Sequence, residues 1–117
     1  MVGPSKNRRL GVLISGRGSN LQSIIDAAAA GRLDATVAVV IANKEDAGGL
    51  ERARRAGVDT VVLKHTSYES REAYDAALID ELRRRDVGLV CLAGFMRLLS
   101  VRFTEAFPDR IVNIHPS

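Results

Sequence analysis

The end of the chain carries an amide and an imidazole two positions apart. Residues 113–117 read Asn-Ile-His-Pro-Ser. Because side chains alternate across a strand, an extended backbone projects Asn113 and His115 from one face and Ile114 from the other, and Pro116 ends the pairing. This pair suits acyl transfer: Asn113 can donate to a carbonyl oxygen that becomes an oxyanion, and a protonated His115 can add positive charge beside it. The alternative is a lone histidine at a strand end beside a capping asparagine.

A glycine-rich turn near the start of the chain could bind an anion. Residues 15–20 read Ser-Gly-Arg-Gly-Ser-Asn. Two glycines allow a tight turn with outward backbone amides, and a helix that begins near Ser19 adds the positive end of its dipole. A dinucleotide-binding fingerprint would need a small residue where Leu21 stands, so a nicotinamide cofactor is disfavoured. The alternative is a turn that only changes the direction of the chain.

A third segment, residues 94–99, reads Gly-Phe-Met-Arg-Leu-Leu and could form an apolar slot with one positive charge. A flat heteroaromatic ligand that carries carboxylates would need such a slot, with Met96 as a flexible apolar wall and Arg97 as the charge. The alternative is ordinary core packing. We favour that alternative for Phe95, Leu98 and Leu99 taken individually.

Two residues that often form sites, His65 and Cys91, are assigned to none. His65 has no cysteine or acidic partner at metal-binding spacing, so no metal is expected. Cys91 lies in an apolar run and is most simply a small core residue. As the only cysteine it cannot form an internal disulfide, and the early apolar run, residues 10–14, is too short for a signal peptide. A cytoplasmic location is therefore expected.

Hydrophobic patterns predict five strands that alternate with four helices. The predicted strands span residues 10–14, 36–42, 60–63, 87–93 and 111–114. The predicted helices begin at Ser19, span residues 50–56, begin after a capping Ser70, and span residues 100–106. This order predicts an α/β fold with an open, mostly parallel, twisted, Rossmann-like sheet and helices on both faces. Ligands bind such sheets at the carboxyl ends of the strands, where the three segments above and residues 43–46 are expected.

Composition and charge are typical of one globular domain. The chain has 117 residues, of which 46% are hydrophobic and 26% charged, enough for one core and no second domain. Three of the 17 basic residues lie in residues 1–9, which contain no acid, so 14 Lys and Arg remain to balance 14 Asp and Glu. We interpret residues 1–9 as a basic disordered tail and residues 10–117 as the folded part. No nucleic-acid or membrane partner is expected, and residues 83–85, all arginine, are predicted to be a solvated helix end.

Four segments together resemble the phosphoribosylglycinamide formyltransferases of purine biosynthesis, which belong to the folate-dependent formyltransferases. These segments are residues 13–21, 70–75, 92–97 and 113–117. The Asn-x-His-Pro-Ser element is shared by the wider group, whereas the Gly-x-Gly-Ser-Asn-Leu loop favours the glycinamide ribonucleotide enzymes over methionyl-tRNA formyltransferase. The resemblance implies transfer of a formyl group from the co-substrate 10-formyltetrahydrofolate to the amine of glycinamide ribonucleotide.

The resemblance also implies roles for individual residues. Gly18, Ser19 and Asn20 would hold the ribonucleotide phosphate, in agreement with the anion site inferred above. Asn113 and His115 would be catalytic and polarise the formyl group while the substrate amine attacks it. The residues that would border the folate are Arg71, Met96, Arg97, Leu98 and Leu99.

The resembling family continues beyond its His-Pro-Ser element into a loop with a catalytic aspartate and into strands and a helix that complete the sheet. Because the C-terminal part is missing after Ser117, we expect the 117-residue chain by itself to be inactive or impaired. An incomplete sheet edge also favours self-association, for example as a homodimer. Two alternative functions stay open: formyltetrahydrofolate deformylase, and a non-catalytic module that binds a phosphate ligand.

Overall fold

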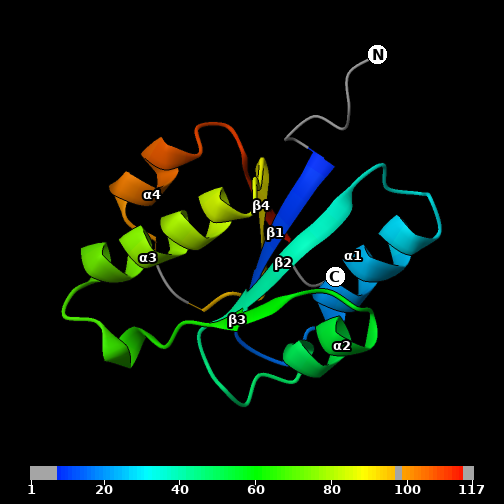
Figure 1. Cartoon of the computed structure of the whole chain (residues 1–117), viewed down its shortest axis with the longest axis horizontal. Helices are drawn as coiled ribbons and strands as arrows, with labels where there is room; N and C mark the ends of the chain where they lie inside the picture. The colour runs from blue at the N-terminus through cyan, green and yellow to red at the C-terminus, as the bar shows by residue number, and fades with distance from the viewer. Residues whose placement is uncertain (1–7, 97–98, 115–117) are drawn as a thin grey trace.

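A five-stranded parallel sheet lies between two pairs of helices in the computed structural model, which describes residues 8–96 and 99–114 (Figure 1). The strands are β1 (Arg9–Ile14), β2 (Thr36–Ala42), β3 (Thr60–Val62), β4 (Leu89–Ala93) and β5 (Ile111–Ile114). The helices are α1 (Ser19–Ala29), α2 (Gly49–Arg55), α3 (Arg71–Arg84) and α4 (Val101–Ala106), with a 3-10 turn, η2 (His65–Ser67). Every predicted strand and helix is present, and η2 was not predicted.

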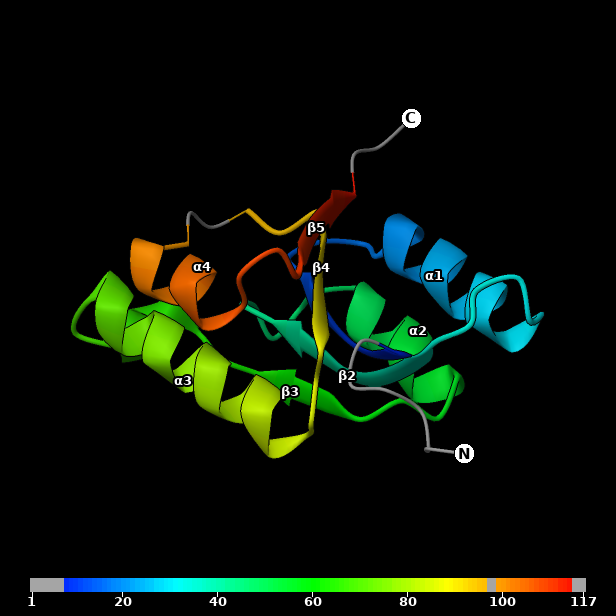
Figure 2. The same ribbon diagram turned by 90° about the horizontal axis from the view of Figure 1, so that it is seen from above.

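The sheet is covered on both faces, as the apolar strands predicted. On β1, Val12 and Ile14 pack into a buried cluster with α1 and α2, whereas Leu13 packs into a second cluster with α3 and α4. This alternation follows from the two-residue period of a strand. Figure 2 shows α1 and α2 on one side of the strands and α3 and α4 on the other.

The strand order β3-β2-β1-β4-β5 locates the expected ligand crevice. From β1 the chain crosses through α1 to β2 on one side, and it later returns through α3 to β4 on the other side of β1. The direction of winding therefore reverses between β1 and β4. In open parallel sheets, ligands bind at the carboxyl ends of the two strands that flank such a switch point. The turn that follows β1 and the segment that follows β4 meet at this place.

Helix α3 begins as the sequence predicted. The hydroxyl of Ser70 accepts a hydrogen bond from the backbone N–H of Ala73 at 3.0 Å, which satisfies one of the donors at the helix start. Tyr74 and Leu78 are buried against the sheet, and the Tyr74 hydroxyl donates to the carbonyl of Leu63 at 2.7 Å. The first turn of α3 is therefore anchored at the carboxyl end of the sheet.

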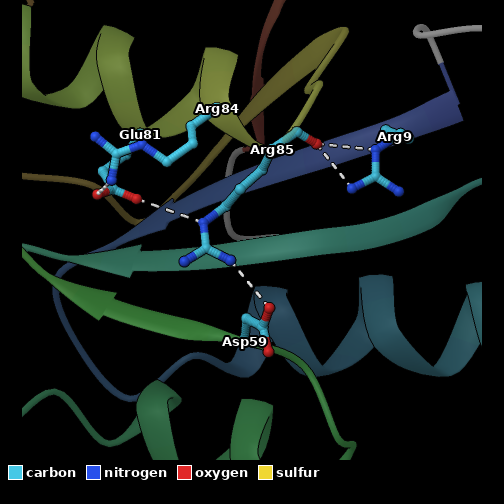
Figure 3. Close-up of polar contacts among 5 residues, drawn as sticks. All are labelled: Arg9, Asp59, Glu81, Arg84 and Arg85. Carbon is cyan, nitrogen blue, oxygen red and sulfur yellow. Dashed lines mark hydrogen bonds and ion pairs between the residues drawn. The ribbon is translucent and has the colours of Figure 1, made fainter.

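The start of the sheet corrects the predicted boundary of the N-terminal tail. Arg9 lies in β1 instead of the tail, so the boundary falls earlier than residue 10, while residues 1–7 lie outside the described residues. The Arg9 guanidinium donates to the carbonyl of Arg85 through Nε at 2.9 Å and Nη2 at 2.7 Å (Figure 3). A carbonyl at the end of a helix lacks an intrahelical partner, so Arg9 ties the end of α3 to the sheet.

The arginine run at the end of α3 was predicted to be solvated, but the Arg85 side chain makes ion pairs that connect parts of the fold. The Arg85 guanidinium forms ion pairs with two carboxylates, Asp59 at 2.9 Å and Glu81 at 3.4 Å (Figure 3). Of the residues that Figure 3 draws, the exposed Arg84 forms an ion pair with Glu81 alone. Arg85 therefore connects α3 to the segment that leads into β3. This network lies at the end of the sheet opposite the expected ligand site.

We expect Arg85→Ala to lower the free energy of unfolding by about 1 kcal/mol, because it removes two partly screened ion pairs and the cover of a half-buried side chain. Arg84→Ala is the matched control, since that exposed side chain should contribute less than about 0.5 kcal/mol. Urea denaturation of both variants tests the difference. Equal losses would contradict the bridging role of Arg85.

Candidate functional site

The turn between β1 and α1 has the backbone geometry of an anion cradle. Gly18 adopts φ +80°, the left-handed region that glycine tolerates best, and it precedes the first residue of α1. A Cβ on Gly18 would lie 2.5 Å from the Cα of Gly49 at the start of α2. Glycine at this position is therefore required twice, by the turn and by the close approach of another helix.

Hydrogen bonds on the protein side hold the carbonyls of the turn. The carbonyl of Gly16 accepts from the N–H of Gly49 at 3.1 Å, that of Arg17 accepts from Arg52 Nε at 2.8 Å, and that of Gly18 accepts from Gln22 at 2.8 Å. Among the described residues, no side chain caps the start of α1. The first N–H groups of the helix are left open to a ligand, at the positive end of the helix dipole.

A pocket of about 190 Å³ lies beside the turn and the first two residues of α1. It is lined by residues 16–20 of the turn and by Ala93 and Gly94 at the end of β4. Pockets that enclose a whole small molecule usually measure about 300–1,000 Å³, so this pocket suits one compact group such as a phosphate. Its position between β1 and β4 is the switch point inferred from the topology. The three predicted phosphate-binding residues, Gly18, Ser19 and Asn20, all line it.

The segment after β4 lies beside this turn, and only some of its apolar side chains are exposed to solvent. Met96 is 79% exposed, and its backbone N–H donates to the hydroxyl of Ser15 at 2.8 Å. Phe95 and Leu99 pack against the cluster under α3 and α4, which confirms the core interpretation for these two. The remaining two predicted folate-bordering residues of this segment, Arg97 and Leu98, lie outside the described residues.

Arg71, the fifth predicted folate-bordering residue, is exposed at the first position of α3. One turn later Asp75 accepts a hydrogen bond from the backbone N–H of Ser100 at 2.6 Å, which holds α3 against the end of the same segment. Arg71 therefore lies at the same end of the sheet as Met96. The guanidinium is available for an anionic group of a ligand in this region.

Asn113 of β5 is in register with the carboxyl-terminal residues of β1 and β4, the two strands that flank the switch point. Parallel pairing aligns Leu13 of β1 with Leu92 of β4, and Leu92 with Asn113. With neighbouring strands about 4.8 Å apart, Asn113 is about 10 Å across the sheet from β1. Asn113 is exposed, while Ile114 packs into the cluster under α1 and α2, so the predicted alternation of this strand is confirmed. His115 lies outside the described residues, and its shared direction with Asn113 stays a prediction.

A second pocket, of about 460 Å³, lies farther along this edge of the sheet. It is lined by residues 43–46 after β2 and residues 64–66 after β3. The Lys64 ammonium hydrogen-bonds to the exposed Glu45 carboxylate and lowers its pKa. Within the described residues, Asn43 Oδ1 and His65 Nδ1 are buried without a hydrogen-bond partner. No described group of three or more His, Cys, Asp or Glu side chains could hold a metal ion, and the absence of a metal from the reaction stays a prediction.

Cys91 should react slowly with alkylating reagents. The side chain is buried in β4, and burial raises the pKa of its thiol. Between the unfolded pKa of about 8.5 and the higher native pKa, the native protein keeps the thiol proton while the unfolded chain loses it. The contribution of the buried, protonated thiol to the free energy of unfolding is therefore complete below about pH 8.5 and is lost as the pH rises through the native pKa. At pH 8.5 we expect iodoacetamide to label native protein roughly 100-fold more slowly than protein in urea. Similar rates would mean that β4 opens readily.

Comparison with known proteins shows the family of the chain. The formyl transferase family matches residues 8–117. The chain belongs to this family. It is 53% identical over 106 residues to the phosphoribosylglycinamide formyltransferase of Escherichia coli K12, covering 91% of the chain and 50% of that protein. It is 44% identical over 112 residues to the human trifunctional purine biosynthetic protein adenosine-3, covering 96% of the chain and 11% of that protein.

The fold of this formyl transferase chain is that of solved relatives. A crystal structure of glycinamide ribonucleotide transformylase 1 from Symbiobacterium toebii superposes with a TM-score of 0.93 at 52% identity, covering 99% of the chain and 55% of that protein. The chain thus spans about half the length of these bacterial relatives. Within residues 8–96 and 99–114, none of the helices has both the length and the apolar character needed to cross a bilayer.

Two buried polar residues of this formyl transferase chain were missed by the sequence analysis. Ser15 was considered only as part of the glycine turn, and Asp75 only as part of the family resemblance. For Asp75 a signal existed, because it shares a helix face with Ile79 and Leu82 at the i, i+4 and i+7 positions. A carboxylate inside an apolar stripe indicates a specific partner. For Ser15 the sequence contains no comparable signal.

Proposed function

We propose that the chain forms the N-terminal half of a phosphoribosylglycinamide formyltransferase, which transfers a formyl group from 10-formyltetrahydrofolate to the amine of glycinamide ribonucleotide. The observation that carries this proposal is the pocket of about 190 Å³ between residues 16–20 and the end of β4, with its open helix N–H groups. The identity of about half of all aligned residues with the Escherichia coli enzyme supports it. A cytoplasmic location is part of the proposal, in keeping with the single free thiol of Cys91.

In this proposal the ribonucleotide is held by its phosphate. The backbone N–H groups around Gly18, Ser19 and Asn20 would donate to the phosphate oxygens, and the dipole of α1 would favour their negative charge. Because the contacts come mainly from the backbone, they hold a phosphate in one place without reading the rest of the molecule. The glycinamide end would extend from this anchor toward β4 and β5.

The folate would lie along the segment after β4. Met96 provides exposed apolar surface, and Arg71 provides positive charge at the same end of the sheet. Leu99 packs partly against the core, and the part of its side chain left uncovered would border the folate. The roles of Arg97 and Leu98 in this slot belong to the proposal as the sequence resemblance implies them. Such an arrangement would hold the formyl carbon close to the substrate amine, and proximity of this kind removes much of the entropic cost of a two-substrate reaction.

Formyl transfer then needs stabilisation of one negative charge. The substrate amine attacks the formyl carbon, a C–N bond forms, and the formyl oxygen becomes an oxyanion. The Asn113 amide would donate to this oxyanion, and a protonated His115 would add positive charge. Collapse of the intermediate breaks the bond from the formyl carbon to the folate nitrogen, which gains a proton as the attacking amine loses one. The resemblance assigns orientation of His115 to an aspartate in the segment that follows in the family.

Two measurements test the proposal. Calorimetry of the 117-residue chain with glycinamide ribonucleotide should give binding that weakens as inorganic phosphate is added. A completed enzyme, made by joining the chain to the C-terminal half of the Escherichia coli relative, should then catalyse formyl transfer while the chain alone does not. Deformylase activity without ribonucleotide binding would replace the proposal by the hydrolytic alternative. Ribonucleotide binding without transfer by the completed enzyme would indicate a non-catalytic phosphate-binding module. The homodimer expected from the sequence is a separate proposal, and sedimentation of the chain alone tests it.

A further inference from the structure

The carbonyl of Arg17, in the turn between β1 and α1, is held by a side chain from another helix. Arg52, on α2, donates to this carbonyl through Nε at 2.8 Å and to Oε1 of Gln22 through Nη1 at 3.4 Å. Its half-buried side chain also passes close to Gly18, where a Cβ would lie 3.4 Å from Arg52 Cδ. The guanidinium therefore connects α2 to the turn and to the start of α1.

Helix α2 gives Arg52 a fixed point of attachment. Leu50 and Ala53, which flank Arg52 on this helix, are 1% and 0% exposed and pack into the buried cluster that also contains residues of α1. The N–H of Gly49, at the start of α2, donates to the carbonyl of Gly16 at 3.1 Å. Arg52 therefore extends to the turn from a helix that is itself anchored in the core.

Restraint of the Arg17 carbonyl determines the direction of the Gly18 N–H. In a planar trans peptide the C=O and the N–H point in opposite directions, so the peptide whose oxygen points toward Arg52 directs its N–H away from Arg52. Within the described residues, no group accepts a hydrogen bond from this N–H. Gly18 lines the pocket of about 190 Å³. Its N–H is therefore available to a ligand there.

The turn needs such a restraint because it contains glycine at this point. Gly18 has φ +80°, but glycine adopts positive and negative φ about equally readily. A half-turn of the peptide between Arg17 and Gly18 is therefore inexpensive, and it would exchange the positions of the oxygen and the N–H. A carbonyl oxygen in the place of the N–H would repel an anion. The hydrogen bond from Arg52 opposes this rotation.

The guanidinium also adds positive charge behind the turn. Among the residues that the structure describes, no Asp or Glu forms an ion pair with Arg52. At physiological ionic strength a charge acts over about 8 Å, and this one has the same sign as the N-terminal end of the α1 dipole. Both therefore favour a negatively charged ligand at the turn.

We propose that Arg52 is a positioning residue for the substrate phosphate: it fixes the peptide between Arg17 and Gly18 so that the N–H faces the phosphate. The inference rests on the proposed function, because that function assigns this turn to the phosphate of the ribonucleotide. Arg52 acts through the backbone of the turn and needs no contact with the ligand. Its loss should therefore weaken ribonucleotide binding and leave the folate and the chemical step unaffected.

Substitutions at Arg52 test the proposal in the 117-residue chain. Arg52→Met keeps most of the apolar stem and removes the donors and the charge. By calorimetry it should weaken binding of glycinamide ribonucleotide and of inorganic phosphate roughly fivefold, the usual effect of one lost hydrogen bond. Arg52→Lys keeps a charged donor and should stay within about twofold of the unaltered chain. Arg54→Met, which removes an exposed arginine from a different face of α2, is the matched control.

Kinetics of the completed enzyme separate positioning from a general structural role. Arg52→Met should raise KM for glycinamide ribonucleotide roughly fivefold and leave kcat and KM for 10-formyltetrahydrofolate within about twofold. Amide NMR spectra add a readout that does not depend on activity, since inorganic phosphate should shift the Gly18 amide less in Arg52→Met than in the unaltered chain. Should Arg52→Met fail to fold, Arg52→Gln carries the test, because glutamine has a similar helix propensity but lacks the charge and the reach of arginine.

Four results would overturn the inference: unchanged phosphate affinity in Arg52→Met, an equal loss in Arg54→Met, an equal loss in Arg52→Lys, or an equal rise in both KM values. Failure of the unaltered chain to bind either glycinamide ribonucleotide or inorganic phosphate is a separate outcome. It would overturn the proposed function, and with it the role of Arg52 toward the phosphate.

Discussion

Gly18→Ala is expected to destabilise the protein by about 2–5 kcal/mol and to weaken ribonucleotide binding at least tenfold. The left-handed backbone at Gly18 costs a non-glycine residue about 1–2 kcal/mol. The new Cβ would also lie 2.5 Å from the Cα of Gly49, and relief of such a backbone clash typically costs about 1–3 kcal/mol. Because either helix must move, the N–H groups beside the pocket would lose their common direction.

Gly31→Ala is a matched control for this variant. Gly31 also has a positive φ, of +77°, but a Cβ there would meet nothing within 4 Å. Both variants share the backbone cost and the loss of unfolded-state entropy, so their difference isolates the clash with Gly49. Urea denaturation gives the stabilities and calorimetry with glycinamide ribonucleotide gives the affinities. If the two variants were equally destabilised, the contact between the phosphate turn and α2 would have no energetic importance.

Asn113→Ala should lower the turnover of formyl transfer by about 100- to 1,000-fold, which is the usual effect of removing one oxyanion donor. Its effect on ribonucleotide affinity should be small, because the phosphate turn follows β1, and β1 lies about 10 Å from Asn113 across β4. The measurement is steady-state kinetics of the completed enzyme, with calorimetry for ribonucleotide binding. A fall in turnover without a fall in affinity assigns Asn113 to the transition state.

Val112→Ala provides the control on the same strand. Val112 is exposed like Asn113, but it projects from the opposite face of β5. We expect this variant to change turnover less than about threefold. Should Val112→Ala impair transfer as strongly as Asn113→Ala, the loss would reflect disturbance of β5. Unchanged turnover in Asn113→Ala would remove Asn113 from the proposed mechanism.

Most of the secondary structure could be predicted from the sequence because its causes are local. The β2 strand agrees with the apolar, β-branched run at residues 36–42, and α3 begins after the Ser70 cap. The strand that ends at Ala93 was predicted two residues too long at its start, since Val87 is buried although it lies before β4. An apolar residue packs in the same way whether or not its backbone pairs, so burial alone does not define a strand boundary.

The sequence by itself determined the alternating order of strands and helices, the parallel sheet that follows from it, and the glycine turn at which an anion site was predicted. These features depend on side-chain periodicity and on backbone preferences of single residues, which act over a few positions. Only the tertiary structure decided that Gly18 meets Gly49, that Ser15 holds Met96 and that Asp75 holds Ser100. Ser15 and Met96 are 81 positions apart, and their contact exists because β1 and β4 pair in one particular register. Such contacts depend on how whole strands and helices pack, and no local pattern in the chain encodes them.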